Sequence, residues 1–282
     1  MRAVLKPASL GELFSLHDRY PDALTMAGGT DLLVRLRRER GEEDRPLFLL
    51  SGIAELQGIA DTGSEISIGA ATTLSRMIDD PLAARHAPLL VSAARTIGAP
   101  AVRNMATIGG NIGTASPAGD LLLPLYLLGA NVELVSQQGP RRLPIGEFIA
   151  GPGRTGLAGR EIITRVLLPY ADSFPFQTFA KVGLRRSLAV AVASFAGVMR
   201  LDAEGHVEEA RFAWGSVAPT IVRLYHLEEE IAGSRLDCDT IRAAAATARG
   251  GVSPIDDIRA TAEYRRSVAA NLLVRFLEGI NV

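Results

Sequence analysis

Cysteine is almost absent from the sequence. Cys238 is the only one in 282 residues. A single cysteine excludes an internal disulfide, and it cannot supply the four thiolates of an iron–sulfur cluster. No uninterrupted apolar run reaches the ~18 residues that span a bilayer, and the N-terminus lacks the apolar core of a signal peptide. These absences predict a cytoplasmic protein without an iron–sulfur cluster of its own.

The sequence also lacks the side-chain patterns of hydrolytic or metal-dependent catalysis. Its four histidines lie far apart in dissimilar contexts, and no pair of carboxylates indicates an acid–base couple. Neither G-x-G-x-x-G after a strand pattern nor G-x-x-x-x-G-K-[ST] occurs. The net charge of −1 indicates no basic surface for nucleic acid. We therefore expect no catalytic or metal-binding side chain, and a bound cofactor would have to carry any reaction.

Charge is balanced along the chain as well as in total. Hydrophobic residues make up 48% and charged residues 22%, as in a globular protein with a core. A basic run is followed at once by an acidic run, which favours a solvated face that compensates its own charge. The two runs are Arg35, Arg37, Arg38 and Arg40, then Glu42, Glu43 and Asp44.

Two glycine-rich stretches are the most informative segments. The first, Thr25 to Asp31, places two glycines between an apolar strand pattern and a helix that Thr30 or Asp31 would cap. The second runs from Met105 to Asp120 and is rich in glycine, threonine and serine. Glycine permits close backbone approach and positive φ, and free N–H groups form anion sites. Both stretches predict loops that cradle a diphosphate, although glycine-rich surface turns are the alternative.

The pattern of apolar residues divides the chain into three regions. Residues 1 to about 52 read as a first lobe and residues 53–172 as a second, each mixing strands with helices. After a change of composition near residue 172, three strand patterns precede three helices, which predicts an α+β domain. The strands are 176–182, 188–201 and 207–217, and the helices are 221–231, 238–249 and 259–277. For the last helix we expect Asp256 or Asp257 as the cap, with Arg265 and Arg266 on the outside.

Three short segments, in this order, resemble a known family. They are Ala27-Gly28-Gly29-Thr30-Asp31, Thr107-Ile108-Gly109-Gly110-Asn111 and Ser116-Pro117-Ala118-Gly119-Asp120. They are similar to the FAD-binding (medium) subunit of molybdenum hydroxylases, the xanthine dehydrogenase and carbon monoxide dehydrogenase family. The resemblance covers nearly the whole chain, including residues 254–266. One departure is that relatives often carry a polar residue or a second serine where this chain has Ala118 and Gly119.

The resemblance implies an α+β fold in two domains. Residues 1–172 would form a two-lobed FAD-binding domain of the vanillyl-alcohol oxidase and p-cresol methylhydroxylase type, with lobes of about 1–52 and 53–172. Residues 173–282 would form a small domain with a three-stranded antiparallel sheet covered by helices.

The resemblance also implies the residues that contact FAD. Asp120 matches a carboxylate that binds ribose or ribityl hydroxyls, and the alternative is that it caps the following helix. Lys181 matches a lysine at the flavin pyrimidine edge, and the alternative is a strand-edge lysine. The other matches lie in the first loop (Met26, Ala27, Gly28, Gly29, Thr30, Asp31), in the second (Thr107, Gly110, Asn111, Thr114), beside the flavin (Ile97, Gly98) and near the adenine or flavin (Ile163).

Function follows from the same resemblance. The chain would carry FAD, bound non-covalently because neither loop holds a histidine or cysteine. A 2Fe–2S small subunit would deliver electrons from a molybdenum-cofactor large subunit, and NAD, a quinone, oxygen or another acceptor would receive them. The three chains would form a heterotrimer, which a two-fold axis can double. The alternatives are a self-sufficient flavin oxidoreductase and a non-enzymatic nucleotide-binding assembly module.

Overall fold

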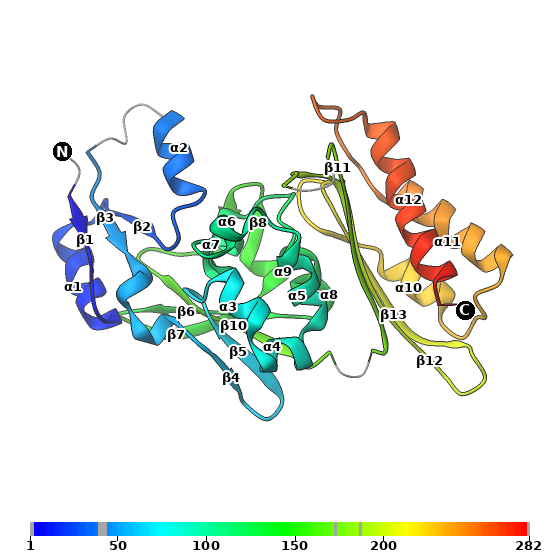
Figure 1. The fold of residues 1–282 in the computed structure, drawn as a ribbon, viewed down its shortest axis with the longest axis horizontal. Helices are drawn as coiled ribbons and strands as arrows, with labels where there is room; N and C mark the ends of the chain where they lie inside the picture. The colour runs from blue at the N-terminus through cyan, green and yellow to red at the C-terminus, as the bar shows by residue number, and fades with distance from the viewer. Residues whose placement is uncertain (1–2, 39–43, 172–173, 186–187, 281–282) are drawn as a thin grey trace. The chain divides into compact units, whose positions relative to one another are not determined.

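The computed structural model describes residues 3–38, 44–171, 174–185 and 188–280 (Figure 1). The chain forms two compact units, each discontinuous in sequence. Unit 1 comprises Met1–Ala84, Gly98–Ala115 and Ala130–Pro169, and unit 2 comprises Arg85–Ile97, Ser116–Gly129 and Tyr170–Val282. No described helix is long and apolar enough to cross a membrane. The predicted domain boundary stays a prediction, and Asp172 and Ser173 beside it lie outside the described residues.

A small parallel sheet opens unit 1. Its strand order is β1-β3-β2, and both pairings are parallel, as predicted for a βαβ-like unit. Ser9 caps α1, since its hydroxyl accepts the Glu12 N–H at 3.1 Å. Leu13 of α1 and Phe48 of β3 are fully buried in the core that joins them. The elements are β1 (Val4–Leu5), α1 (Leu10–Arg19), β2 (Leu24–Met26), α2 (Leu32–Arg38) and β3 (Leu47–Leu49).

The second sheet of unit 1 is antiparallel and has five strands, in the order β4-β5-β10-β6-β7. The strands are β4 (Ile59–Asp61), β5 (Glu65–Gly69), β6 (Asn131–Ser136), β7 (Gly139–Pro144) and β10 (Ile162–Pro169). The remaining elements of residues 50–155 outside unit 2 are η1 (Leu50–Gly52), η2 (Ala54–Leu56), α3 (Leu74–Asp79), α6 (Pro100–Arg103), α7 (Ile108–Thr114), α9 (Ile145–Phe148), β8 (Ile149–Gly151) and β9 (Arg154–Thr155); α4 (Pro81–His86) follows α3. Thr73 caps α3 by accepting the Arg76 N–H at 3.3 Å.

Unit 2 is an antiparallel sheet covered by helices on both faces. Its order is β11-β12-β13-β14. α10 and α12 pack on one face, α5 and α8 pack on the other, and α11 packs on α10 and α12 (Figure 1). The first nine residues of β12 are all buried, because both of its faces are covered. The elements are α5 (Pro88–Arg95), α8 (Leu122–Leu127), β11 (Phe176–Gly183), β12 (Ala191–Leu201), β13 (Val207–Gly215), β14 (Val222–Arg223), α10 (Tyr225–Ile231), α11 (Cys238–Gly251) and α12 (Ala262–Glu278).

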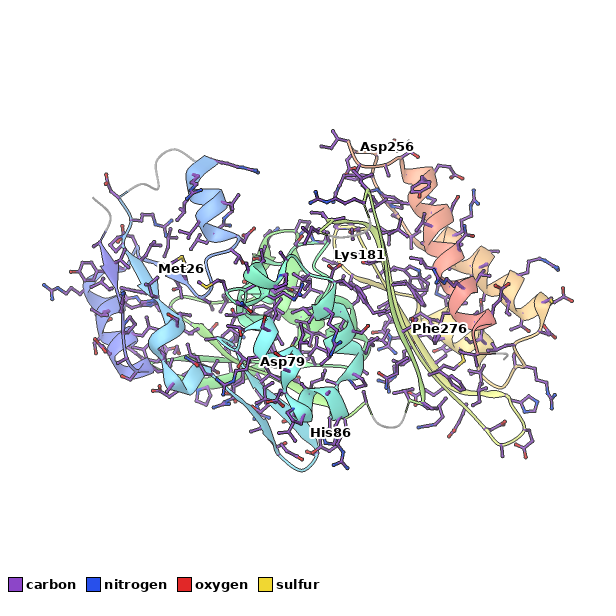
Figure 2. All side chains as sticks on the ribbon, viewed as in Figure 1. Met26, Asp79, His86, Lys181, Asp256 and Phe276 are labelled. Carbon is purple, nitrogen blue, oxygen red and sulfur yellow. The ribbon has the colours of Figure 1, made fainter. Side chains whose placement is uncertain are left out.

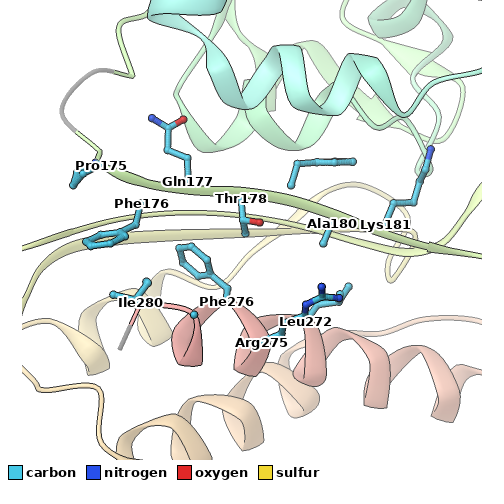
Figure 3. A pocket seen from close by; sticks show the side chains of 12 residues that line it. Pro175, Phe176, Gln177, Thr178, Ala180, Lys181, Leu272, Arg275, Phe276 and Ile280 are labelled. Atoms are coloured by element: carbon cyan, nitrogen blue, oxygen red, sulfur yellow. The ribbon is translucent and has the colours of Figure 1, made fainter. Parts of the chain in front are cut away.

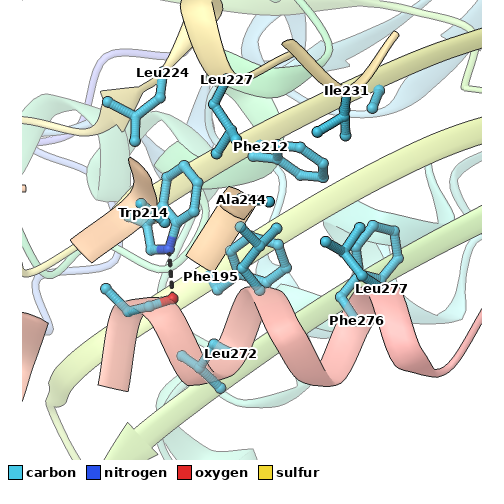
Figure 4. Packing of buried hydrophobic residues seen from close by; sticks show 14 of the residues in the cluster. Phe195, Phe212, Trp214, Leu224, Leu227, Ile231, Ala244, Leu272, Phe276 and Leu277 are labelled. Carbon is cyan, nitrogen blue, oxygen red and sulfur yellow. Dashed lines mark hydrogen bonds between the residues drawn. The ribbon is translucent and has the colours of Figure 1, made fainter. Parts of the chain in front are cut away.

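Aromatic side chains fill the core between the sheet of unit 2 and its C-terminal helices (Figure 4). The rings of Phe195 and Trp214 lie 5.3 Å apart between centroids, and Phe276 of α12 lies 5.9 Å from Phe195. The Trp214 indole N–H donates to the Ala269 carbonyl at 3.0 Å. Tilted pairs of this kind add about 0.5–1.5 kcal/mol each beyond area burial. Through this core, α12 packs against the middle of the sheet.

The structure differs from the predicted elements of this region in two places. The helix predicted from residue 221 begins at Tyr225, because Val222 and Arg223 first pair with β13 as an added fourth strand. The strand predicted from residue 188 begins at Ala191. Leu188 has a φ of 55°, a left-handed conformation that no strand accommodates.

The start of α12 also differs from the prediction. Its cap is Thr261, whose hydroxyl accepts the Tyr264 N–H at 3.2 Å. Arg265, predicted to lie outside, is only 1% exposed. Its Nη1 donates to the Val192 and Ser216 carbonyls at 2.9 Å each, and its Nη2 lies 2.6 Å from Asp257 Oδ1. These acceptors compensate part of the burial of the guanidinium, whose Nε has no hydrogen-bond partner among the described residues.

Candidate functional site

The two glycine-rich stretches are in direct contact within unit 1. A Cβ atom added to Gly28 would lie 1.7 Å from the Met105 carbonyl oxygen and 3.0 Å from the Ala106 nitrogen. The backbone of the first stretch therefore lies against the backbone that leads into the second. Only glycine permits this approach. Met26, labelled in Figure 2, ends β2 immediately before this contact.

The first stretch forms a turn with free backbone donors. Gly29 has a φ of 70°, so the turn uses the left-handed conformation that favours glycine. The N–H groups of Gly29, Thr30 and Asp31 have no acceptor among the described residues. The Gly29 carbonyl accepts the Leu33 N–H at 3.1 Å, which joins the turn to α2. Consecutive free donors of this kind suit an anionic group such as a phosphate.

The second stretch was predicted to be a loop with free amides, and this is wrong for residues 108–114. They form the short helix α7, capped by the Thr107 hydroxyl, which accepts the Gly110 N–H at 3.0 Å. The Ile108 and Gly109 N–H groups donate to the Thr72 and Ala70 carbonyls at 3.2 and 2.9 Å. The first turn of α7 is therefore already paired, and its backbone donors are not free for a ligand.

What α7 offers instead is a surface without side chains. Gly109 faces the protein, since a Cβ there would lie 2.6 Å from the Ala70 Cβ. Gly110 and Gly113 are exposed and lie three residues apart, on one side of the helix. A Cβ on Gly113 would lie 3.5 Å from Ile163 Cδ1, so Ile163 adjoins this side. A flat ligand can approach the bare helix backbone here more closely than any larger residue would permit.

Polar side chains complete this part of unit 1. Thr107 is buried, and the Thr114 hydroxyl donates to the Gly110 carbonyl at 3.0 Å. The side-chain oxygen of Asn111 is buried and has no hydrogen-bond partner among the described residues. An unpaired buried acceptor costs about 1–3 kcal/mol. A bound ligand with a suitable donor would remove that cost.

Ile97 and Gly98 fall on opposite sides of the division between the units. Gly98, in unit 1, has a φ of 50°, and its carbonyl accepts Arg103 Nη1 at 2.7 Å. Ile97, in unit 2, follows α5, and its N–H donates to the Ala94 carbonyl at 3.1 Å. Both residues are half-buried.

Unit 2 contributes a buried ion pair between Asp120 and Lys181. Lys181 Nζ lies 2.6 Å from Asp120 Oδ2 and also donates to the Thr96 carbonyl at 2.9 Å. Their side chains are 11% and 8% exposed for the lysine and the aspartate, so Lys181 is not an ordinary strand-edge lysine. Asp120 does not cap α8 either, because Leu121 is the N-cap and no side chain bonds there.

Asp120 is an electrostatically unusual carboxylate. Burial raises its pKa above the ordinary value, and the Lys181 cation and, to a smaller extent, the Thr96 side chain offset part of that rise. Its Oδ1 atom is buried without a hydrogen-bond partner among the described residues. One carboxylate oxygen thus holds the lysine, and the other is left to accept from a hydroxyl or an N–H.

Ser194 is a buried polar residue beside the ion pair that was not among the predicted site residues. It lies opposite Lys181 in the β11–β12 pairing, is fully buried, and its hydroxyl has no partner among the described residues. Side chains directly opposite on antiparallel strands share one face of the sheet. Placing Ser194 beside Lys181 requires the register of β11 against β12. The sequence alone does not give that register.

A separate groove of about 570 Å³ lies between β11 and α12 (Figure 3). Phe176 and Phe276 are among the side chains that line it, and its charged lining residues are Lys181 and Arg275. Figure 3 shows Gln177 and Lys181 pointing away from α12. The Lys181 ammonium therefore belongs to the Asp120 pair rather than to this groove.

The chain matches known families over nearly its full length. Residues 1–171 match the FAD binding domain in molybdopterin dehydrogenase, and residues 178–280 match the CO dehydrogenase flavoprotein C-terminal domain. The chain is 34% identical over 267 residues to a putative xanthine dehydrogenase FAD-binding subunit of Escherichia coli (strain K12), covering 92% of this chain and 89% of the relative.

Solved structures agree with this match. Quinoline 2-oxidoreductase from Pseudomonas putida 86 contains a chain with a TM-score of 0.93 at 28% identity, covering 99% of this chain and 96% of that one. Carbon monoxide dehydrogenase from Hydrogenophaga pseudoflava contains one with a TM-score of 0.89 at 31% identity, covering 98% and 96%.

These findings define a flavoprotein of the two-domain type. The chain belongs to the family of FAD-binding subunits of molybdenum hydroxylases, which includes the xanthine and carbon monoxide dehydrogenases. It is an oxidoreductase subunit with FAD as its cofactor, as the sequence predicted. The residues present fit this cofactor, because the free amides after Gly28, the bare side of α7 and the unpaired Asn111 and Asp120 oxygens are groups that a nucleotide can occupy.

Proposed function

We propose that the turn after Gly28 and the bare side of α7 hold the diphosphate and an adjoining part of FAD. The contact between Gly28 and Met105 carries this proposal, because it brings both glycine stretches together around free backbone donors. The residues proposed to contact the cofactor in unit 1 are Met26, Ala27, Gly28, Gly29, Thr30, Asp31, Gly98, Thr107, Gly110, Asn111, Thr114 and Ile163. Backbone N–H groups of the turn would donate to phosphate oxygens.

In unit 2 we assign Ile97, Asp120 and Lys181 to the cofactor. When bound, FAD supplies the redox chemistry that no side chain of this protein offers. Asp120 would accept from a ribose or ribityl hydroxyl through its unpaired Oδ1. Lys181, held by Asp120 and by the Thr96 carbonyl, would keep its cation at a fixed position near the flavin pyrimidine edge. A cation so held stabilises negative charge on the ring.

The chain is proposed to act inside a larger complex. It would receive electrons from a 2Fe–2S small subunit, supplied by a molybdenum-cofactor large subunit, and pass them to an acceptor such as NAD, a quinone or oxygen. Its single cysteine supports this, because the chain cannot build a four-cysteine cluster itself. The relatives are named as subunits or medium chains, which agrees with a heterotrimer. A dimer of heterotrimers would follow from a two-fold axis.

The cofactor assignment is tested by acid precipitation of the purified protein. Neither glycine stretch holds a histidine or cysteine, so we expect all yellow colour in the supernatant, with FAD rather than FMN on chromatography. Colour that stays with the pellet would indicate a covalent flavin and contradict the proposal.

The complex is tested by affinity purification of this chain from its native host at low salt. We expect two further chains in the eluate, together with molybdenum and iron. Full substrate turnover by this chain alone would instead identify a self-sufficient flavin oxidoreductase.

A further inference from the structure

His17 is a buried titratable side chain that the proposed cofactor site does not use. It lies in the last turn of α1 and is 8% exposed. Its ring stacks on the ring of Phe48, with 4.9 Å between the centroids and 24° between the planes. Its Nε2 atom is buried and has no hydrogen-bond partner among the described residues. A proton bound there would place a charge in an apolar core without an acceptor.

The surroundings of His17 oppose that charge. Burial lowers the pKa of His17 most, the Arg160 cation lowers it further, and Asp18 raises it. Strand β3, which carries Phe48, has no titratable residue. The other charged residues of α1 are engaged elsewhere, since Glu12 accepts the Ala8 N–H at 2.7 Å and Arg19 lies over the Tyr20 ring.

His17 lies where the first sheet of unit 1 meets the second. Phe48 of β3 packs in one core with Ile162 of β10. Asp18, the neighbour of His17, pairs with Arg160 just before β10. It also accepts the side-chain amide of Gln137, in the turn between β6 and β7, at 3.0 Å. A charge on His17 would therefore disturb the contact between α1 and the second sheet.

The same contact leads to the turn proposed to hold FAD. Phe48 is paired with Thr25 in the parallel register of β2 and β3. Thr25 and Met26 end β2, which runs directly into the Gly28 and Gly29 turn. One ring contact and one strand pairing thus connect His17 with the strand that carries this turn.

His17 is the only histidine of unit 1, because the other three, His86, His206 and His226, belong to unit 2. Histidine is the side chain whose ordinary pKa, about 6.5, falls between pH 5 and pH 8. The neighbouring ion pair does not titrate in this range, because the Gln137 hydrogen bond and the Arg160 cation hold the pKa of Asp18 below its ordinary value. The response of this contact to mild acid therefore depends on His17.

We infer that His17 is an acid-sensitive switch, which holds α1 closed on unit 1 when neutral and favours an opened state of α1 and β2 when protonated. The opened state exposes the imidazole to water and binds the proton more readily. The closed state consequently loses stability as the pH falls below about 6.5. The effect on the cofactor rests on the proposed function: FAD held by the turn after Gly28 would dissociate faster in acid.

The test is hydrogen exchange of the full-length, FAD-loaded chain, followed by mass spectrometry in peptides that cover residues 10–16 and 24–31. Protection is expressed relative to an unstructured peptide at the same pH, so that the pH dependence of the exchange chemistry cancels. We expect protection of both segments to fall at least about threefold from pH 8 to pH 5. His17→Phe and His17→Gln stay neutral, so each should keep its own protection across this range, whatever its level at pH 8.

A matched control changes a histidine of unit 2. His226, on α10, is exposed, so His226→Gln should retain the response of the unaltered chain. The rate of FAD release, followed by the fluorescence of the freed flavin, is the second readout. It should rise by a similar factor at pH 5 in the unaltered chain and in the His226 variant, and in neither His17 variant.

Protection that does not change with pH in the unaltered chain overturns the inference, and so does an equal fall in both His17 variants. A fall that requires His17, without faster release of FAD, supports the switch but contradicts the assignment of FAD to the turn after Gly28. The two readouts therefore separate a failure of the switch from a failure of the proposed cofactor site.

Discussion

The proposed cofactor residues of the two units are arranged by opposite means. In unit 1, main-chain groups come together because side chains are missing, as at Gly28 against Met105 and on the bare side of α7. In unit 2, charged side chains come together because they are buried, as in the pair of Asp120 with Lys181. Arg265 is another buried charge of unit 2, held by the Val192 and Ser216 carbonyls.

The difference has a physical consequence. A contact that requires the absence of a side chain is disrupted sterically when a side chain is added. The resulting loss of stability therefore does not depend on pH. A contact between buried charges is disrupted when one partner is removed, because the other charge then stays desolvated without compensation. The resulting loss of stability depends on which groups are ionised, and so on pH. Three substitutions, from the largest expected effect to the smallest, test this contrast.

The largest effect is expected in unit 2 from Arg265→Met. The substitution leaves the Val192 and Ser216 carbonyls without a donor and removes one partner of Asp257. Each buried carbonyl left without a donor costs about 1–3 kcal/mol, so the two together are expected to cost about 2–6 kcal/mol. Urea unfolding followed by tryptophan fluorescence measures this loss, since Trp214 reports on the same core. Arg242→Met, at a side chain 77% exposed, is the control and should change stability by less than about 0.5 kcal/mol. A loss that small in the Arg265 variant would mean that the buried contacts of Arg265 contribute little to stability.

The second effect is expected in unit 1 from Gly28→Ala. The added methyl group would meet the Met105 carbonyl, and neither backbone can yield cheaply. Overpacking of this kind costs about 3 kcal/mol, and we expect flavin content to fall with it. The deficit in free energy of unfolding should be the same at pH 5 and pH 8. Gly250→Ala, where a Cβ meets nothing within 4 Å, is the matched control and should keep the flavin. A Gly28 variant with normal flavin content would remove this turn from the site.

The smallest effect, and the one that should vary with pH, is expected from Lys181→Met. Without the cation, the pKa of Asp120 in the folded protein rises further above its value in the unfolded chain. The folded state then binds the proton more readily, so stability falls as pH rises between the two pKa values. We expect a deficit of about 1–3 kcal/mol at pH 8, shrinking as the pH is lowered toward about 4.

Combining Lys181→Met with Asp120→Asn is the control for this pH dependence. The amide carries no charge, so the double variant should show a deficit that no longer changes with pH. A pH-independent deficit in the single variant would mean that Asp120 is not the group responsible.

The sequence was most predictive where only one backbone conformation explains the presence of a residue type. Glycine at residues 28 and 29 indicated a tight turn, and the structure has a left-handed Gly29. The helical state of residues 108–114 was not predictable, because three glycines lower helix propensity. The Thr107 cap and the packing of Gly109 on Ala70 stabilise this helix through contacts distant in sequence.

Buried charge was the least predictable feature. Arg265 sits in a segment rich in charged residues that reads as a solvated helix start, and its acceptors come from β12 and from the residue after β13. Lys181 and Asp120 were predicted singly from the family resemblance, but their pairing links positions 61 residues apart. Pairing between distant positions depends on topology rather than on local pattern. The cofactor roles of these residues stay predictions.

The discontinuity of unit 2 also affects the order in which the protein can fold during synthesis. Helices α5 and α8 leave the ribosome within the first 130 residues, yet the strands that cover their apolar faces begin only at Phe176. At translation rates of about 5–20 residues per second, α5 waits roughly 4–16 s for β11. During that interval its buried leucines, Leu89 and Leu90, have no sheet to pack on. The nascent chain is therefore expected to need a chaperone at this stage. A fragment that stops near residue 171 should aggregate.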